Sequence, residues 1–304
     1  MAHTHTVETP LPAPRFPSRP VPVPGPGRVP EPGREDDTGV MDLLSRVVDT
    51  LHGYFELGNE AVSFGAATVV SAPGCPQVYD ANCATRVRAG TPAEIEQVLA
   101  EVDRRHAELG HRCFKIDPFT PAPFEARLVL EGYRVDVELQ SVLDGPLWGP
   151  DPATGSRSLE IRSVVTDADW ASLATLLRSD HEEEAAKAQR ACWAAEVTDQ
   201  MVEQRRRKAP DVQFFLAAWE GRDCAFFSSW PGVGGIGKVE DLFSAPSFRH
   251  RGIATALIHH AVTDARRRGA GPVLIGAVAD DTPKSMYAAL GFRPVLLYRS
   301  YVKA

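Results

Sequence analysis

The chain has 304 residues, enough for one large or two small domains, and its formal net charge is -7. This mildly acidic balance does not suggest a phosphate-backbone partner, so nucleic-acid binding is not expected. No apolar run approaches the length of a membrane-spanning helix and no secretory signal is recognisable, so no membrane partner is expected either. The five cysteines are scattered without metal-ligand spacing, which favours free thiols in a reducing cytoplasm and predicts no metal site.

Residues 1–38 hold ten of the 25 prolines and have few apolar side chains to bury, which predicts a disordered Pro-rich tail. Apolar periodicity then predicts an N-terminal α+β domain over residues 39–147. Its expected elements are a helix over 40–57, strands over 67–71 and 84–88, a helix from 91 to about 110, a strand over 112–116, a short helix over 123–130 and a strand over 133–143.

Turn-forming residues from Asp144 to Pro152 indicate a linker, which we place at residues 148–157, before a second domain over 158–304. The second domain is expected to contain a strand over 159–164, a helix from Thr166, a helix over 197–208, a hairpin over 212–230, a strand over 239–244, a helix from 254, a strand over 272–278, a short helix ending at Gly291 and a strand over 293–301.

The turn between the strand over 239–244 and the helix from Ala254 carries two arginines and Gly252. The first N–H groups of a helix lack internal partners and the helix dipole is positive at that end, so such a turn can hold an anion. The alternative is an ordinary basic turn that caps a surface helix.

The ordered set of strand, Arg249-x-x-Gly252-x-Ala254 turn, helix, strand and Tyr287-x-x-x-Gly291-Phe292 ending resembles the GCN5-related N-acetyltransferase (GNAT) superfamily over residues 158–304. The resemblance implies an α/β (α+β) GNAT fold, with a mixed central sheet flanked by helices, and an acyltransferase that uses acetyl-CoA as co-substrate. Two positions depart from the usual pattern, because Ala254 replaces the commoner Gly and Asp280 stands where many relatives have Asn.

The first half repeats the order of helix, strand, short helix, Gly-aromatic pair and strand, with Gly132-Tyr133 in the place of Gly291-Phe292. It has no Arg-x-x-Gly-x-Gly/Ala turn. We interpret it as a smaller, degenerate GNAT-like lobe that shapes the acceptor pocket, and an unrelated α+β cap remains the alternative.

The resemblance also implies where the donor is bound. The pyrophosphate of acetyl-CoA is expected on the turn, and the expected donor-binding residues are Leu242, Phe243, Ser244, Arg249, His250, Arg251, Gly252, Ile253, Ala254, Thr255, Asp280 and Lys284. Tyr287 is expected beside the thioester sulfur as proton donor to the leaving thiolate, unless it is a core tyrosine with a satisfied hydroxyl. The run from His181 to Glu184 is either a solvated helix face or an acidic cluster that attracts a cationic amine.

An amine attacks a thioester only when it is neutral, yet a typical alkylammonium has a pKa of about 10, so a base is needed. Glu240 and Asp241 are the candidate catalytic carboxylates of the strand, and period-two alternation places them on opposite faces. Glu240 is the better candidate, because relatives often place a base on that face. A structural carboxylate paired with a cation is the alternative.

The leading hypothesis is an acetyl-CoA-dependent N-acetyltransferase that acts on a primary amine of a small molecule by direct attack in a ternary complex, as a cytoplasmic monomer or homodimer. An acyltransferase of the same fold with a protein or peptide acceptor, or a longer acyl donor, is one alternative. A CoA-binding sensor without turnover is the other.

Overall fold

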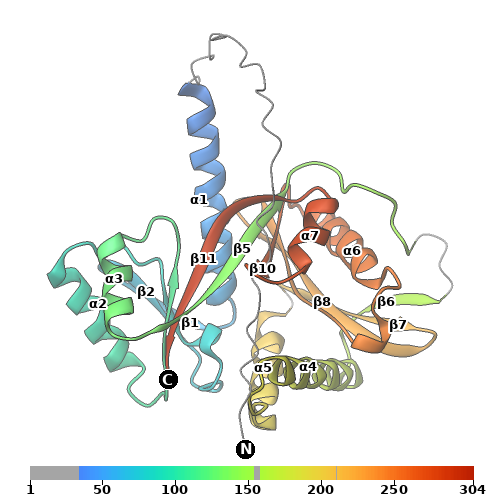
Figure 1. Ribbon diagram of the computed structural model, residues 1–304, viewed down its shortest axis with the longest axis horizontal. Coiled ribbons are helices and arrows are strands. Elements are labelled where there is room, and N and C mark those ends of the chain that lie inside the picture. The colour runs from blue at the N-terminus through green and yellow to red at the C-terminus, as the bar shows by residue number, and fades with distance from the viewer. Residues whose placement is uncertain (1–33, 154–157, 210) are drawn as a thin grey trace, which may run out of the picture. The chain divides into compact units, whose positions relative to one another are not determined.

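The computed structural model describes residues 34–153, 158–209 and 211–304 (Figure 1). Most of the predicted Pro-rich tail lies outside these ranges. Two units, Met1–Gly39 and Val40–Ala304, are distinguished by their internal contacts, and the sheet and the site belong to the second. Helix α1 (Arg34–Glu56) begins before the predicted start at residue 40 and ends one residue before the predicted end.

An 11-stranded sheet runs through the second unit in the order β1-β2-β3-β4-β11-β5-β10-β9-β8-β7-β6. It is mixed, because β3 pairs β4 and β9 pairs β10 in parallel while the other pairs are antiparallel. The strands are β1 (Glu60–Phe64), β2 (Ala67–Ser71), β3 (Cys83–Thr85), β4 (Arg112–Ile116), β5 (Arg134–Leu143), β6 (Leu159–Ser163), β7 (Gln213–Trp219), β8 (Arg222–Val233), β9 (Ile236–Ser244), β10 (Val273–Val278) and β11 (Arg293–Lys303).

The helices after α1 are α2 (Pro92–Arg105), α3 (Ala122–Leu130), α4 (Asp167–Lys187), α5 (Ala195–Lys208), α6 (Ile253–Arg267) and α7 (Pro283–Ala289), with 3-10 turns η1 (Tyr79–Ala81) and η2 (Pro246–Phe248). The predicted N-caps of α2 and α4 are confirmed, because Thr91 and Thr166 each form a capping box. β1 was missed by the sequence interpretation, since three of its five side chains are exposed or polar and give no buried alternation. Among the described helices, none combines the length and apolarity needed to cross a bilayer.

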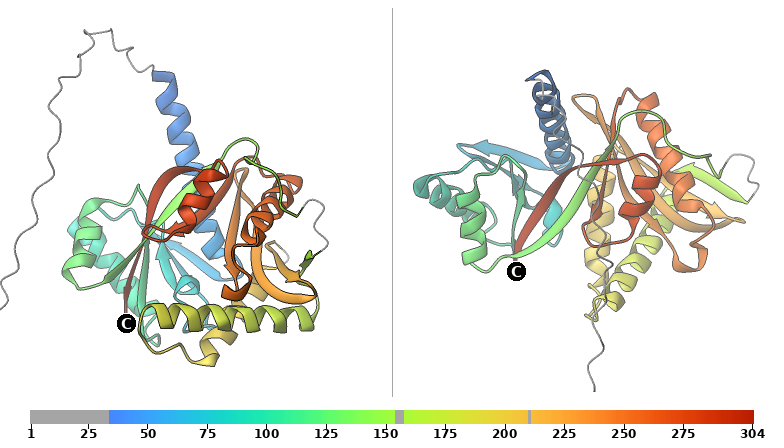
Figure 2. Two further views of the ribbon diagram at one scale, coloured as in Figure 1. Left: turned by 45° about the vertical axis from the view of Figure 1, so that its right-hand side comes forward. Right: turned by 45° about the horizontal axis from the view of Figure 1, so that its top comes forward.

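Helices cover both faces of the second half of the sheet (Figures 1 and 2). On β7, Phe215 and Ala217 pack into a core with α6, whereas Phe214 and Leu216 pack into another core with α4 and α5. Alternate residues of a strand point to opposite faces, so a strand buried on both faces needs apolar residues throughout, as β7 has. The predicted fold class, a mixed sheet flanked by helices, is confirmed.

The last strand of the chain lies in the middle of the sheet rather than with its sequence neighbours alone. β11 is inserted between β4 and β5, and β5 in turn pairs β10 (Figure 1). α1 adds a shared core across this centre, where Val47 and Leu51 pack with Leu274 and Tyr298. The sheet therefore continues across the predicted linker at residues 148–157, and the division into two domains stays a prediction.

Because β5 and β11 join the halves within one sheet, we expect them to unfold together. The five tryptophans all lie within residues 148–230, so their fluorescence reports the second half, whereas far-UV circular dichroism reports the helices and strands of both. Urea unfolding followed by the two signals should give coincident transitions. A loss of dichroism at lower urea than the fluorescence change would show that the first half unfolds independently.

Candidate active site

The two parallel strands of the second half separate before they end. Residues 273–275 of β10 pair with residues 237–239 of β9, but residues 276–278 pair only with β5 on the other side. β9 continues along β8 instead. The carboxyl ends of β9 and β10 therefore diverge, and backbone groups of β9 beyond Val239 have no partner strand on the β10 side. Ligands of open α/β sheets commonly bind in such a crevice.

A cavity of about 340 Å³, which we call the strand cavity, occupies this opening. Its lining includes Glu240, Asp241 and Leu242 of β9 and Tyr287 of α7, all of which were predicted from the sequence. Three acidic residues that were not predicted as site residues, Asp180 of α4, Glu138 of β5 and Asp281, line it as well. The full lining is Glu138, Asp180, Val239, Glu240, Asp241, Leu242, Ile275, Gly276, Ala277, Val278, Asp281, Pro283 and Tyr287.

A β-bulge interrupts β9 at Asp241. Ser228 of β8 pairs with Glu240 and Phe226 pairs with Phe243, so one residue of β8 opposes two of β9, and Asp241 has a φ of 62°. The prediction that Glu240 and Asp241 lie on opposite faces was wrong for this reason. Both line the strand cavity, because the bulge breaks the period-two alternation at this point.

Tyr287 is buried at the base of α7, where its ring lies 6.1 Å from that of Phe292. Burial, with a smaller contribution from Asp281, raises the pKa of its phenol to about 12. Its hydroxyl forms no hydrogen bond with any described residue. At neutral pH the side chain is therefore a protonated phenol. Its O–H group is not used in a hydrogen bond to any described residue.

The carboxylates of β9 and α4 that line the cavity differ in their partners. Asp241 accepts a hydrogen bond from Arg205 at 2.5 Å and one from the Tyr54 hydroxyl at 3.5 Å. Glu240 forms an ion pair with the buried Lys238, and burial lowers the pKa of that lysine to about 8. Asp241 is thus the most firmly held of the carboxylates on β9.

Asp180 has no cationic partner among the described residues. Burial, followed by the charges of Glu184 and Glu183, raises the pKa of its carboxyl to about 6. Asp180 directly precedes the acidic run from His181 to Glu184 that was predicted from the sequence. Unlike the residues of that run, Asp180 lines the strand cavity. Within that run, His181 is buried and its Nδ1 lies 2.9 Å from the Thr198 hydroxyl.

The turn before α6 has the predicted glycine at the helix N-terminus, and its two arginine side chains contact other residues of the protein. Gly252 is the N-cap of α6 with a φ of 77°, and His250, which is exposed, also has a positive φ of 61°. Arg249 forms a bidentate pair with Glu183 of α4 at 2.8 and 2.6 Å. The Arg251 guanidinium lies over the Trp219 ring, 5.4 Å from its centroid.

Successive backbone amides around such left-handed residues form a concave anion site, as the helix N-terminus does. Ile253, Ala254 and Thr255 occupy the first turn of α6, whose N–H groups lack partners within the helix. The turn thus offers backbone donors, while its arginine side chains are held by Glu183 and by aromatic rings.

The remaining donor residues expected from the sequence are dispersed. Phe243 is buried beside Phe226, away from the strand cavity. Ser244 has a buried hydroxyl without a partner among the described atoms. Asp280 is exposed, and the Lys284 ammonium donates to the Ala279 carbonyl at 2.7 Å.

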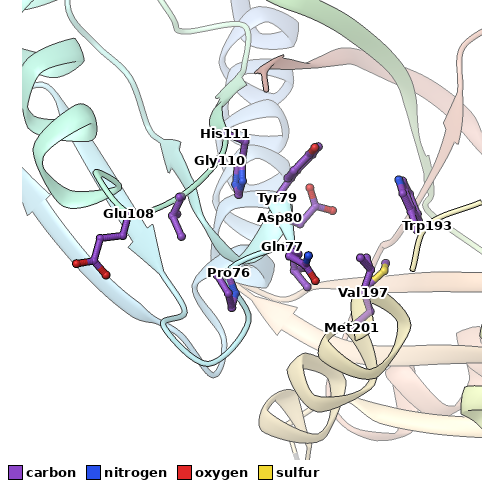
Figure 3. Close-up of a pocket in the computed structure, with 12 residues that line it drawn as sticks. Pro76, Gln77, Tyr79, Asp80, Glu108, Gly110, His111, Trp193, Val197 and Met201 are labelled. Atoms are coloured by element: carbon purple, nitrogen blue, oxygen red, sulfur yellow. The ribbon is translucent and has the colours of Figure 1, made fainter. Parts of the chain in front are cut away.

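Two further cavities lie next to one another and to the strand cavity, as their shared lining residues show. A small one of about 70 Å³, the junction cavity, shares Glu138, Glu240 and Asp241 with it. A larger one of about 580 Å³, the outer cavity, shares Val78, Asp80 and Met201 with the junction cavity. Figure 3 shows the outer cavity, with Tyr79, Asp80 and His111 on one side and Trp193, Val197 and Met201 on the other. Residues of the first half therefore line both of these cavities.

The described residues contain no group of three or more His, Cys, Asp or Glu side chains that could hold a metal ion. All five cysteines are free, and all but Cys192 are buried.

Residues 170–292 match the model of the Acetyltransferase (GNAT) family. These residues form an acetyltransferase domain of the GNAT family. They contain β9, β10 and Tyr287 of the strand cavity together with the turn before α6, whereas Glu138 and the residues of the first half lie outside the match. The domain is an acyltransferase.

Solved structures resemble most of the chain and not only residues 170–292. A GCN5-related N-acetyltransferase from Kribbella flavida is 15% identical with a TM-score of 0.61, and the match covers 87% of this chain and 95% of that one. A functionally unknown conserved protein from Staphylococcus epidermidis ATCC 12228 is 13% identical with a TM-score of 0.60, covering 81% and 94%. A tandem GNAT protein from the clavulanic acid biosynthesis pathway is 13% identical with a TM-score of 0.52, covering 88% and 95%. At this identity the likeness shows the fold, and a search of curated proteins finds no match.

The raised pKa of Asp180 in the GNAT domain has a consequence for stability. The native state favours the protonated acid, so the ionised form lowers the free energy of unfolding above pH 6, and the cost disappears below the unfolded pKa of about 3.9. Asp180→Asn should therefore raise the free energy of unfolding by about 1–3 kcal/mol at pH 7.5 and leave it nearly unchanged at pH 3.5.

Urea unfolding at the two pH values measures this difference. Asp199→Asn on α5 is the matched control, because Asp199 is exposed and should change stability by less than about 0.5 kcal/mol. Equal stability of Asp180→Asn and the unsubstituted protein at pH 7.5 would show that Asp180 is not held in a desolvated position.

Proposed function

We propose that the chain transfers an acetyl group from acetyl-CoA to a primary amine of a small molecule, by direct attack of the amine on the thioester in a ternary complex. The main observation in support of this proposal is the separation of β9 from β10. It leaves backbone groups of β9 around the Asp241 bulge unpaired toward the strand cavity, where they can align the pantetheine arm and polarise the thioester carbonyl.

The turn before α6 is proposed to hold the pyrophosphate through its backbone. Gly252 and the first N–H groups of α6 supply donors at the positive end of the helix dipole. The Arg249–Glu183 pair keeps the turn in place from α4 rather than offering its own charge to the phosphates. The expected donor contacts therefore come mainly from the main chain.

The chemistry requires one proton to leave the amine and one to reach the sulfur. We assign Glu240 as the base that accepts the amine proton, directly or through water. As the carbon–nitrogen bond forms and the carbon–sulfur bond breaks, Tyr287 donates to the departing thiolate. Because its pKa is about 12, Tyr287 enters the reaction protonated, which is the state that a donor needs.

Asp180 is a second candidate base that lines the same cavity. A pKa of about 6 is close to the value at which a carboxylate is both ionised and basic at neutral pH. Glu240 differs in being paired with the buried Lys238 ammonium. Substitution of each carboxylate is expected to change the pH dependence of the rate differently, so kinetic measurements can show which of them is the base.

The acceptor is proposed to be a small molecule that reaches the thioester through the junction and outer cavities. Both are lined in part by the first half of the chain, through residues such as Tyr54 and Asp80. This supports the interpretation of that half as a GNAT-like lobe that shapes the acceptor pocket. A cytoplasmic monomer or homodimer supplied by cellular acetyl-CoA fits this role.

Tyr287→Phe should lower kcat by about 10²–10⁴-fold across the neutral range, because it removes the donor to the thiolate without changing the ionisation of the amine. Release of free CoA with a panel of primary amines measures the rate, and mass spectrometry identifies the acetylated product. Calorimetry should give an unchanged CoA affinity. Tyr133→Phe is the matched control, since this tyrosine lies in the first half and its pKa is likewise raised to about 12 by burial.

Two outcomes of this experiment would contradict the proposal. A Tyr287→Phe variant with the unsubstituted rate would remove Tyr287 from the mechanism. CoA binding without release of free CoA with any amine would favour a sensor over an enzyme.

Glu240→Gln should slow the reaction most at pH values where the amine is still charged, and raising the pH should partly restore the rate as the amine loses its proton unaided. The pH dependence of kcat/KM at saturating acetyl-CoA measures this recovery. Asp180→Asn, examined in parallel, should show a smaller deficit. The opposite order of the two deficits would assign the base to Asp180.

A further inference from the structure

The junction cavity lies between the strand cavity and the outer cavity, at the meeting point of the two halves of the chain. Its lining comes from α1, the η1 region, α5 and strands β5, β9 and β11: Leu51, Tyr54, Phe55, Val78, Asp80, Glu138, Met201, Gln204, Arg205, Lys208, Lys238, Glu240, Asp241 and Tyr298. It shares Glu138, Glu240 and Asp241 with the strand cavity and Val78, Asp80 and Met201 with the outer cavity.

Most charges around the junction cavity are paired with one another. The Lys115 ammonium donates to Asp80 at 2.6 Å. Arg205 donates to Asp241 at 2.5 Å, and Lys238 is paired with Glu240. In each of these three pairs the two charges balance one another, so none of them requires a charged ligand.

Lys208 is the exception among the lining cations. It is 3% exposed, and its Nζ lies 3.5 Å from the centroid of the Tyr54 ring. Within residues 34–153, 158–209 and 211–304 it has no hydrogen-bond acceptor and no ion-pair partner. Burial is the main cause that lowers its pKa to about 7. A buried ammonium without an anion is costly, and a bound anion would remove that cost.

Two more donors from the same helix face point to the same kind of ligand. Gln204 and Arg205 are 6% and 8% exposed, and the Gln204 Nε2 and Arg205 Nε atoms are buried without hydrogen-bond partners among the described atoms. Gln204 and Lys208 are four residues apart and Arg205 lies between them, so the three side chains share one face of α5. All three line the junction cavity and all three offer N–H groups.

The size of the cavity restricts the ligand. A volume of about 70 Å³ admits a group of a few heavy atoms and excludes a nucleotide or a protein side chain with its backbone. A planar carboxylate offers two oxygens and about four acceptor sites, which matches a set of donors without acceptors. The adjoining acids on the other side are Glu240 and Glu138, the latter bonded only by the Gln140 amide at 2.9 Å among the described groups.

We propose that the acceptor is an amino acid-like molecule whose carboxylate is bound in the junction cavity by Lys208, Gln204 and the free N–H of Arg205. Its amine then reaches the strand cavity past Glu138 and Glu240, which both cavities share. Any apolar remainder of the molecule extends into the outer cavity between Trp193 and Tyr79 (Figure 3). This inference rests on the proposed acetyl transfer and specifies its substrate class.

The test compares pairs of amines that differ only in the carboxyl group. Each α- or ω-amino acid of a panel is assayed beside the alkylamine that lacks its carboxylate, with the full-length protein and saturating acetyl-CoA. For at least one pair, kcat/KM should be about tenfold or more higher for the amino acid, as expected for a charge-assisted contact. Equal values in every pair would overturn the proposal.

Lys208→Met and Gln204→Leu then connect the preference to the cavity. Lys208→Met keeps the length of the side chain and removes a buried charge, so the fold should be retained, which the melting temperature checks. In both variants the ratio of kcat/KM values within the preferred pair should fall toward one. Lys303→Met, at the exposed end of β11, is the control and should keep the ratio. A ratio that survives Lys208→Met would overturn the assignment.

Calorimetry separates this inference from the proposed function. The same amino acid and its decarboxylated partner are titrated into the protein with CoA, where no turnover is needed. Tighter binding of the amino acid that is lost in Lys208→Met supports a carboxylate site even if no amine is acetylated. Acetylation without any carboxylate-dependent binding or rate supports the proposed function and overturns the carboxylate site.

Discussion

β9 and β10 pair in parallel over residues 237–239 and 273–275 and then part, and the site depends on that separation. The pairing of β10 with β5 and the pairing of β9 with β8 maintain this separation. β10 keeps its pairing with β5 to its last residue, while the bulge at Asp241 bends β9 toward β8. An unpaired stretch of strand backbone is normally a liability, but here it faces a cavity and can serve a ligand. Tyr287, Glu240 and Asp180 converge on it from three different elements.

The sheet that supports this opening is shared by both halves of the chain. Since β11 lies between β4 and β5, the position of β5, and through it of β10, depends on strands from both halves. α1 packs over the same centre and contributes Tyr54 to the junction cavity. The first half therefore does more than cover the acetyltransferase domain, because it helps to fix the geometry of the domain's own strands.

The site also contains several buried charged side chains. Several ionisable side chains where the halves meet, such as Arg205, Lys208 and Lys238, are buried. A buried charge needs an oppositely charged partner or an altered pKa. Asp80, Asp241 and Glu240 have oppositely charged partners. Asp180 and Lys208 have none among the described residues, and the pKa of each is shifted so that its neutral form is favoured. Groups with such displaced values in a cavity are candidates for function, as they have no structural pairing that accounts for their retention.

The sequence by itself determined most of the elements, the turn at Gly252 and the helix that carries Tyr287, because these depend on local periodicity, caps and motif spacing. Only the tertiary structure decided which carboxylates face the cavity, since the bulge at Asp241 changes the alternation that the sequence implies. Likewise Lys208 ends a basic run that is typical of a solvated helix terminus, and only its packing against Tyr54 from α1 buries it. Contacts between segments far apart in the chain leave no periodic signal, so neither Asp180 nor the junction cavity could be read from the sequence alone.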